Sequence, residues 1–146
     1  MIRSAIVNHP IDPSSLIAEV RSDDAGALSV FIGTVRDTSD GRSVNKLEYE
    51  AYQAMAETEL SSIVHEAAEK FGVDALVAEH RVGELDIGEV SVVIVSAHTH
   101  RAAAIDCTRF IIEEIKKRVP IWKREHFVDG TREWVDPTAR AEASAP

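Results

Sequence analysis

The chain has 146 residues, of which 45% are hydrophobic and 28% charged, and its formal net charge is −9. This composition is typical of one soluble globular domain that buries a core of its own. The excess of acidic residues argues against general binding to the phosphates of nucleic acids. The single cysteine, Cys107, excludes a disulfide within the chain, which suits a reducing compartment. Because neither a signal-peptide core nor a bilayer-spanning apolar run is present, we expect a cytoplasmic protein.

One helix and two strands are predicted in the first third of the chain. Asp12 followed by Pro13 is typical of a helix start, and this helix is expected to end near residues 22–24. The apolar run over residues 27–35 predicts a buried strand. Residues 44–52 alternate enough to form a second strand. The side chains expected on one face of that strand are Leu47, Tyr49 and Ala51.

The middle of the chain carries the clearest periodicity. Residues 54–71 predict an amphipathic helix, and Gly72 is placed to end it. Residues 75–81 predict a strand, and residues 82–88 hold a turn. The nearly continuous apolar run over residues 90–97 predicts a central strand that is covered on both faces.

The last third predicts a long helix and a hairpin. The helix covers residues 101–118, and Pro120 ends it. Residues 121–128 and 131–135 then predict two strands about a turn at Asp129 and Gly130. This order of elements predicts a two-layer α+β domain in which the helices pack on one sheet.

The domain organisation is expected to be simple, because the sequence holds no internal repeat, linker or low-complexity block. We expect one domain over residues 1–138. The small and polar residues 139–146 are expected to form a disordered tail.

Residues 116–124 form a basic island in this acidic chain, which indicates a local anion site. Lys116 and Lys123 flank Pro120, where the chain must turn, so the turn could bring the two amines together. Two close ammonium groups lower the pKa of at least one of them, and such a lysine can act as a general acid, a base or a nucleophile. The alternative is that these residues only complement the negative end of the helix dipole.

A second candidate site lies where the strand over residues 90–97 meets the helix over residues 101–118. Backbone N–H groups at a helix start attract anions, and Arg101 could add a bidentate contact to phosphate. His98 and His100 would share a face if the strand continued, which is a possible metal pair. A third ligand is not obvious, so we expect no metal, and a plain polar strand end fits these residues equally well.

Three single residues have competing interpretations. Arg36 follows an apolar strand and opens a polar loop, which is a common place for a binding residue, although a solvated arginine also fits. Cys107 lies on the apolar stripe of its predicted helix and is interpreted as a core residue, not a nucleophile. Trp122 would face away from Lys123 in a strand and is predicted to lie in the core.

Several segments, taken together and in this order, carry a resemblance to a known family. They are residues 31–36, 47–52, 80–85, 100–101 and 119–125. They resemble the MoaE family, the large catalytic subunits of molybdopterin synthase. The likeness runs from about residue 25 to residue 135, and its most specific part is the run from Pro120 to Glu125 together with the lysine before it.

The resemblance implies an α/β hammerhead fold with an additional small antiparallel β subdomain. It implies a sulfurtransferase that moves sulfur from the thiocarboxylated C-terminus of a small ubiquitin-like, MoaD-like carrier subunit to cyclic pyranopterin monophosphate. The product is the dithiolene of molybdopterin, in molybdenum cofactor biosynthesis. It also implies a homodimer that binds one carrier at each end through the carrier's Gly-Gly tail, giving a heterotetramer. No cofactor, metal, nucleic acid or membrane is part of this expectation.

The same resemblance implies a set of site residues. The catalytic lysines match Lys116 and Lys123, with Lys116 the first choice for the essential group. The substrate-binding positions match Thr34, Val35, Arg36, His100, Arg101, Arg124 and Glu125. The chain departs from the family in two places, since Thr34 stands where members can carry a lysine and the segment over residues 126–134 differs in length.

Distance adds a prediction about assembly. In one straight helix, Arg101 and Lys116 lie roughly 22 Å apart at about 1.5 Å per residue, too far for one small substrate to touch both. We therefore predict that His100 and Arg101 complete the pocket of the partner subunit across a dimer interface.

Two other functions remain compatible with the sequence. One is a non-catalytic module that holds an anionic metabolite at the basic island, in which case substitution of Lys116 would weaken binding without abolishing a reaction. The other is a structural subunit that only scaffolds a complex, and the intact lysines at both motif positions count against it.

Overall fold

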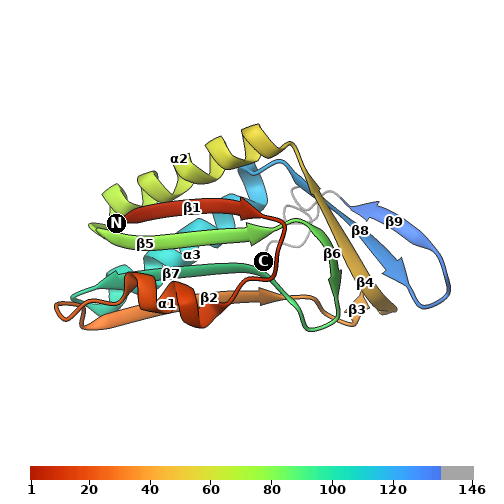
Figure 1. The fold of residues 1–146 in the computed structure, drawn as a ribbon, viewed down its shortest axis with the longest axis horizontal. Helices are drawn as coiled ribbons and strands as arrows, with labels where there is room; N and C mark the ends of the chain where they lie inside the picture. Colours follow the sequence, from red (N-terminus) through yellow and green to blue (C-terminus); the bar gives the residue numbers. More distant parts are fainter. Residues whose placement is uncertain (136–146) are drawn as a thin grey trace.

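The computed structural model describes residues 1–135, which form two β-sheets and three helices (Figure 1). The predicted tail over residues 139–146 and the last three residues of the predicted domain lie outside the described residues. The elements in chain order are β1 (Ile2–Val7), α1 (Pro13–Val20), β2 (Ala27–Thr34), β3 (Thr38–Ser39), β4 (Arg42–Ala51), α2 (Gln53–Phe71), β5 (Ala75–Arg81), β6 (Gly83–Asp86), β7 (Val90–His98), α3 (Arg101–Arg118), β8 (Ile121–Phe127) and β9 (Arg132–Val135).

The first sheet has the strand order β1-β5-β7-β2. β1 pairs in parallel with β5, and the other neighbours are antiparallel. Helices α2 and α3 pack on one face of this sheet, and the short α1 packs on the other face (Figure 1). The expected α+β class is therefore confirmed, with α1 adding a partial third layer.

Apolar periodicity explains the cover on both faces of the first sheet. β7 is buried from Ser91 to Ala97, as its continuous apolar run predicts. Alternate side chains of a strand point to opposite faces, so Ile94 packs under α2 and α3 while Val93 and Val95 pack under α1. On α3, the predicted apolar stripe is buried and includes Cys107.

The helix ends follow local chemistry. Asp12 caps α1 by accepting a hydrogen bond from the backbone N–H of Ser14 at 3.1 Å. Gly72 ends α2 in the left-handed conformation, with φ of 65°. α3 ends at Arg118, two residues before Pro120, which cannot continue a helix.

The second sheet stands across one end of the first sheet (Figure 1). It has the order β3-β4-β8-β9, and β6 also pairs with β4. The predicted hairpin is confirmed as β8 and β9, and the small β subdomain implied by the resemblance is present. A separate apolar cluster holds this end together, formed by Val35, Val44, Leu47, Leu85 and Phe127.

Three expectations from the sequence need correction. The strand predicted to be buried over residues 27–35 is an edge strand, and its outward side chains Leu28, Val30 and Ile32 are 39–43% exposed. Trp122 is half-buried against the exposed ring of Tyr52, with ring centroids 4.9 Å apart, and does not lie in the core. Residues 82–88, which were predicted to hold a turn, also contain the strand β6, and β1 and the two-residue β3 were not predicted either, because none of the three shows a clear two-residue alternation.

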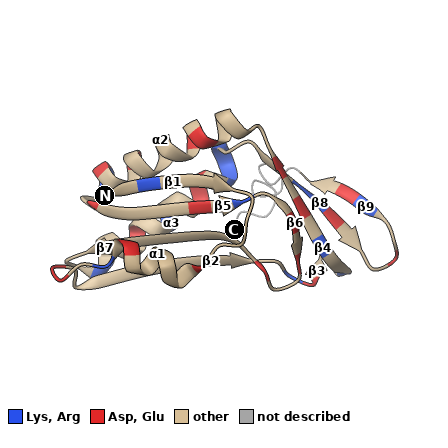
Figure 2. Ribbon diagram, in the orientation of Figure 1, with Lys and Arg blue, Asp and Glu red and all other residues tan. Residues whose placement is uncertain are grey.

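Charge is distributed unevenly over these elements. Acidic residues are spread over α1, α2, β4, β6 and β9, whereas basic residues gather where α3 ends and along β8 (Figure 2). Within residues 1–135, no helix combines the length and the apolar character that crossing a membrane would require.

Candidate functional site

A pocket of about 240 Å³ lies between the two sheets, beside the last turns of α3. Its lining side chains come from β2 and the loop after it, from β3, β4, β5 and β7, and from α3 and β8. The polar and charged residues that line it are Thr34, Arg36, Thr38, Ser39, Tyr49, His80, Ser91, Lys116, Lys123 and Glu125. The apolar residues that line it include Phe31, Leu47, Ile112, Ile115, Val119 and Ile121.

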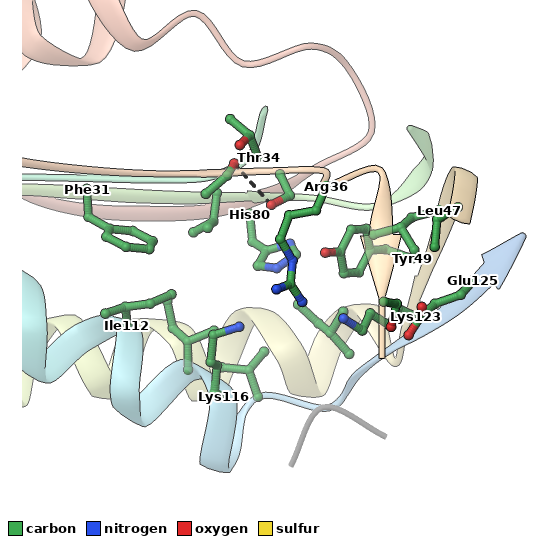
Figure 3. A pocket seen from close by; sticks show the side chains of 18 of the residues that line it. Phe31, Thr34, Arg36, Leu47, Tyr49, His80, Ile112, Lys116, Lys123 and Glu125 are labelled. Carbon is green, nitrogen blue, oxygen red and sulfur yellow. Dashed lines mark hydrogen bonds between the residues drawn. The ribbon is translucent and has the colours of Figure 1, made fainter. Parts of the chain in front are cut away.

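The two motif lysines meet in this pocket. Lys116 comes from the last turn of α3, and the chain turns at Pro120 before β8 carries Lys123 back toward the sheet junction. Both side chains line the pocket, and Arg36 reaches in between them from the loop after β2 (Figure 3). The turn at the end of α3 thus produces the juxtaposition that the sequence predicted.

The pKa of Lys116 is lowered from its ordinary value. The main cause is burial beside the pocket, although part of the Lys116 residue is exposed to solvent. The positive charge of Arg36 is the second cause. The expected repulsion between the two lysines is therefore not what lowers this pKa. An amine with a lowered pKa is a better base or nucleophile near neutral pH.

Val35 holds the loop that carries Arg36 in place. Val35 is buried, its backbone N–H donates to the carbonyl of Glu89 at 3.0 Å, and its carbonyl accepts from the N–H of Gly88 at 2.9 Å. Val35 therefore does not line the pocket itself but ties the loop down on either side of Thr34 and Arg36, which do.

Arg124 and Glu125 lie on opposite faces of β8, as neighbours in a strand must. Glu125 is 1% exposed and lines the pocket. The guanidinium of Arg124 instead lies over the ring of Trp134, 4.4 Å from its centroid, on the outer face of the second sheet. Of these two motif residues, only Glu125 lines the pocket.

The floor of the pocket contains polar residues that sequence reasoning did not select. His80 is the second-last residue of β5, and its ring packs edge-on to Tyr49 of β4 with centroids 5.2 Å apart. Tyr49 in turn hydrogen-bonds Ser91 of β7, and burial raises its pKa. The available signal was a histidine near the end of a predicted strand, within the segment 80–85 that already carried the family resemblance.

His100 and Arg101 lie away from this pocket, at the other end of α3. The helix is continuous from Arg101 to Arg118, as expected, and His100 caps its start without a side-chain hydrogen bond. The rings of His98 and His100 are 5.9 Å apart, and Nδ1 of His98 accepts from the backbone N–H of His100. Within residues 1–135, no cluster of three or more potential ligands could hold a metal ion.

The fold and the site together define a class of protein. It is a mixed α/β protein with a pocket between two sheets that is lined by cationic side chains, a buried carboxylate and a lysine of lowered pKa. A family model described as MoaE protein matches residues 6–118. The chain therefore belongs to the MoaE family, which confirms the resemblance.

Named relatives agree with this assignment. The chain is 45% identical over 130 residues to the molybdopterin synthase catalytic subunit of Thermoplasma volcanium, covering 88% of this chain and 94% of that one. It is 42% identical over 126 residues to the molybdopterin synthase catalytic subunit of Emericella nidulans, covering 86% of this chain and 65% of that one. The chain thus spans slightly less than two thirds of the fungal relative.

Solved structures show the same fold. Molybdopterin synthase from Staphylococcus aureus matches with a TM-score of 0.84 and 37% identity, over 90% of this chain and 95% of that one. A protein–protein complex of subunits 1 and 2 of molybdopterin-converting factor from Helicobacter pylori contains a chain that matches with a TM-score of 0.73 and 28% identity, over 90% of this chain and 89% of that one.

Proposed function

We propose that this chain is the catalytic subunit of a molybdopterin synthase. It transfers sulfur from the thiocarboxylated tail of a small ubiquitin-like carrier to cyclic pyranopterin monophosphate, in molybdenum cofactor biosynthesis. The observation that carries the proposal is the pocket between the two sheets, where Lys116, Lys123 and Arg36 surround one cavity. The names of the relatives support the same reaction.

The pocket has the chemistry that this reaction needs. A thiocarboxylate and a phosphate are both anions, and charge-assisted hydrogen bonds from lysine and arginine hold anions well. As the sulfur attacks carbon, protons must move and negative charge must be stabilised. Lys116, with its lowered pKa, is the first candidate for proton transfer, and Lys123 is the second catalytic lysine.

The proposed protein partner is a carrier that ends in Gly-Gly. The Helicobacter pylori relative forms a complex of two molybdopterin-converting factor subunits, which supports a small subunit as partner. A cavity of about 240 Å³ is smaller than the roughly 300–1,000 Å³ of pockets that bury a drug-sized ligand. One chain's pocket therefore suits the narrow end of a peptide and only part of a pterin.

We propose that a second copy of the chain completes the pocket. β2 is an edge strand, and its outward residues Leu28, Val30 and Ile32 form an exposed apolar strip beside an unpaired strand edge. Edge strands and apolar strips of this kind favour association. Two β2 strands paired antiparallel about a two-fold axis would bury both strips.

The direction of β2 links this dimer to the active site. The first residue of β2, Ala27, lies opposite His98, close to the start of α3, and the last residue, Thr34, lines the pocket. Antiparallel pairing of two β2 strands therefore brings the start of α3 in the partner toward this chain's pocket. Arg101 of the partner subunit and His100 of the partner subunit would then supply the phosphate contacts that this chain's own copies cannot reach.

Reconstitution tests the proposal directly. The chain is mixed with a thiocarboxylated carrier and cyclic pyranopterin monophosphate, and molybdopterin formation is measured. We expect Lys116→Ala to lower the rate by about 100-fold or more, the usual contribution of a positioned acid or base. Lys117→Ala is the matched control, since Lys117 is one residue further along α3, lies outside the pocket and has a side chain 63% exposed.

The control should retain the rate of the unmodified chain. Absence of molybdopterin with the unmodified chain, or equal rates for the two lysine variants, would contradict the proposed enzyme. Retained carrier binding with no reaction in any condition would instead favour a non-catalytic binding module.

A further inference from the structure

The floor of the pocket carries a buried ring to which the proposed chemistry assigns no task. His80 is 8% exposed, and its ring points from the end of β5 into the pocket beside Tyr49 (Figure 3). It comes from the first sheet, whereas Lys123 and Glu125 come from the second sheet on the far side of the cavity. His80 therefore faces any ligand that enters between the sheets.

The hydrogen bonds of His80 determine which nitrogen carries the proton. Its Nδ1–H donates to the carbonyl oxygen of Arg81 at 2.8 Å. A carbonyl oxygen can only accept, so the neutral ring leaves a lone pair on Nε2. Burial lowers the pKa of His80 to about 4, which keeps the ring neutral near pH 7. Within residues 1–135, no group donates to Nε2, and this nitrogen is not sealed from solvent, so its lone pair opens to the pocket.

The hydroxyl of Ser91 beside His80 is already engaged, since it donates to the carbonyl of Gly33 at 3.2 Å. Burial raises the pKa of Tyr49, so its hydroxyl keeps its proton near pH 7. The acceptor on this part of the floor is therefore Nε2 of His80, while Lys116 and Arg36 present cationic donors nearby.

We propose that His80 is a specificity residue whose Nε2 accepts a hydrogen bond from the last peptide N–H of the carrier's Gly-Gly tail. A peptide C-terminus places an N–H donor one carbon away from an anionic group, which matches an acceptor beside cations. This inference rests on the proposed function.

An amide-to-ester exchange tests this hydrogen bond without relying on catalysis. A carrier ending in Gly-Gly carboxylate is prepared with either an amide or an ester between its last two residues, and its affinity for the chain is measured. The ester lacks the N–H. We expect the unmodified chain to bind the amide carrier about 3- to 10-fold more tightly, the range for one net hydrogen bond.

Variants at His80 assign the bond to this residue. His80→Leu removes the acceptor and should bind the two carriers equally, whereas His80→Gln keeps an acceptor oxygen and should retain part of the preference. The carbonyl of the ester is also a weaker acceptor than that of the amide. Subtracting the amide preference of His80→Leu from that of the unmodified chain removes this contribution. If His80→Leu fails to fold, equal affinity of the unmodified chain for the two carriers still overturns the inference, and His80→Gln takes the place of His80→Leu in the comparison.

Three results would overturn the inference. The first is equal affinity of the unmodified chain for the two carriers. The second is a preference that persists in folded His80→Leu, which would assign the bond to another acceptor such as Glu125. The third is an effect of His80→Leu on the KM for the pterin alone, which would make the pterin the donor. Failure of both carriers to bind would overturn the proposed function itself, and this inference with it.

Discussion

Two titratable side chains in the pocket, Lys116 and His80, have lowered pKa values for the same main reason. Burial removes water from the charged form of each group, and no carboxylate within residues 1–135 forms an ion pair with Lys116 to offset it. Arg36 adds repulsion at Lys116, and Lys116 adds repulsion at His80. The pocket therefore holds an amine that loses its proton readily and an imidazole that stays neutral.

The lowered pKa of His80 predicts a loss of stability in weak acid. The folded chain holds His80 at a pKa of about 4, against about 6.5 in the unfolded chain. Between these values the unfolded state binds more protons, so stability is complete above about pH 6.5 and falls as the pH drops toward 4. From pH 7 to pH 5 we expect the free energy of unfolding to fall by about 2 kcal/mol from this group.

Urea unfolding at the two pH values measures this loss. His80→Gln cannot titrate and should lose about 2 kcal/mol less than the unmodified chain over the same interval. The carboxylates with lowered pKa values, such as Glu84 and Asp129, contribute equally to both proteins. An identical pH dependence in the two proteins would mean that His80 is not held neutral by burial.

At the scale of elements, β2 connects the two ends of the molecule. Gly26, just before it, approaches the loop between β7 and α3 so closely that an added Cβ would lie 2.3 Å from the carbonyl oxygen of Thr99. Gly33, near its other end, lies beside a register shift and lines the pocket, and an added Cβ there would lie 2.6 Å from Cγ1 of Val92. Both ends of β2 thus require a residue without a side chain.

The two glycines predict different costs for the same substitution. Gly26→Ala meets backbone, which must shift, so we expect a loss of about 2–3 kcal/mol in the free energy of unfolding. Gly33→Ala meets a side chain that can rotate, so we expect about 1 kcal/mol, together with weaker carrier binding because the pocket narrows. Urea unfolding and a carrier titration measure the two effects, and a Gly26→Ala chain as stable as the parent would contradict the argument.

At the scale of the whole molecule, the site described within one chain lacks His100 and Arg101. α3 separates these residues from Lys116. The exposed strip of Leu28, Val30 and Ile32 lies on β2, the edge strand of the first sheet. A dimer through β2 would cover the strip and bring the partner's His100 and Arg101 to the pocket. One interface would therefore serve both stability and catalysis.

Mixing two inactive chains tests the shared site. Lys116→Ala and Arg101→Ala chains are unfolded together, refolded and assayed with the carrier and pterin. A mixed dimer has one pocket with both substitutions and one intact pocket, so random association should restore about one quarter of the unmodified activity. Each variant refolded alone is the control. No recovery in mixtures that contain mixed dimers would show that Arg101 does not act across the interface.

Much of the fold could be predicted from the sequence because its signals are local. The helices over residues 54–71 and 101–118 repeat apolar residues every three or four positions. Gly72 ends the first helix, and Pro120 follows the end of the second. The buried strand over residues 90–97 is a continuous apolar run. β1 escaped prediction because its residues owe their strand structure to parallel pairing with β5, more than 70 positions away.

The candidate site was predictable only in part. Lys116, Lys123, Arg36, Thr34 and Glu125 line the pocket, as the resemblance implied that the site residues would cluster. Arg124 and Val35 are neighbours of lining residues but do not line the pocket themselves. The alternation of side chains along β8 points Arg124 to the outer face, and Val35 is buried and holds its loop through two backbone hydrogen bonds. A motif identifies a segment, whereas the register of that segment decides which of its side chains face the cavity.

The sequence by itself determined the family, the three helices, the longer strands from residue 27 onward and the two lysines, because periodicity, caps and a contiguous motif depend only on residues that are near in the chain. Only the tertiary structure decided that His80 and Tyr49 form the pocket floor, that burial and then Arg36 lower the pKa of Lys116, and that β2 is an exposed edge. These features depend on burial and on pairing between distant segments, and both exist only once the two sheets have packed against each other.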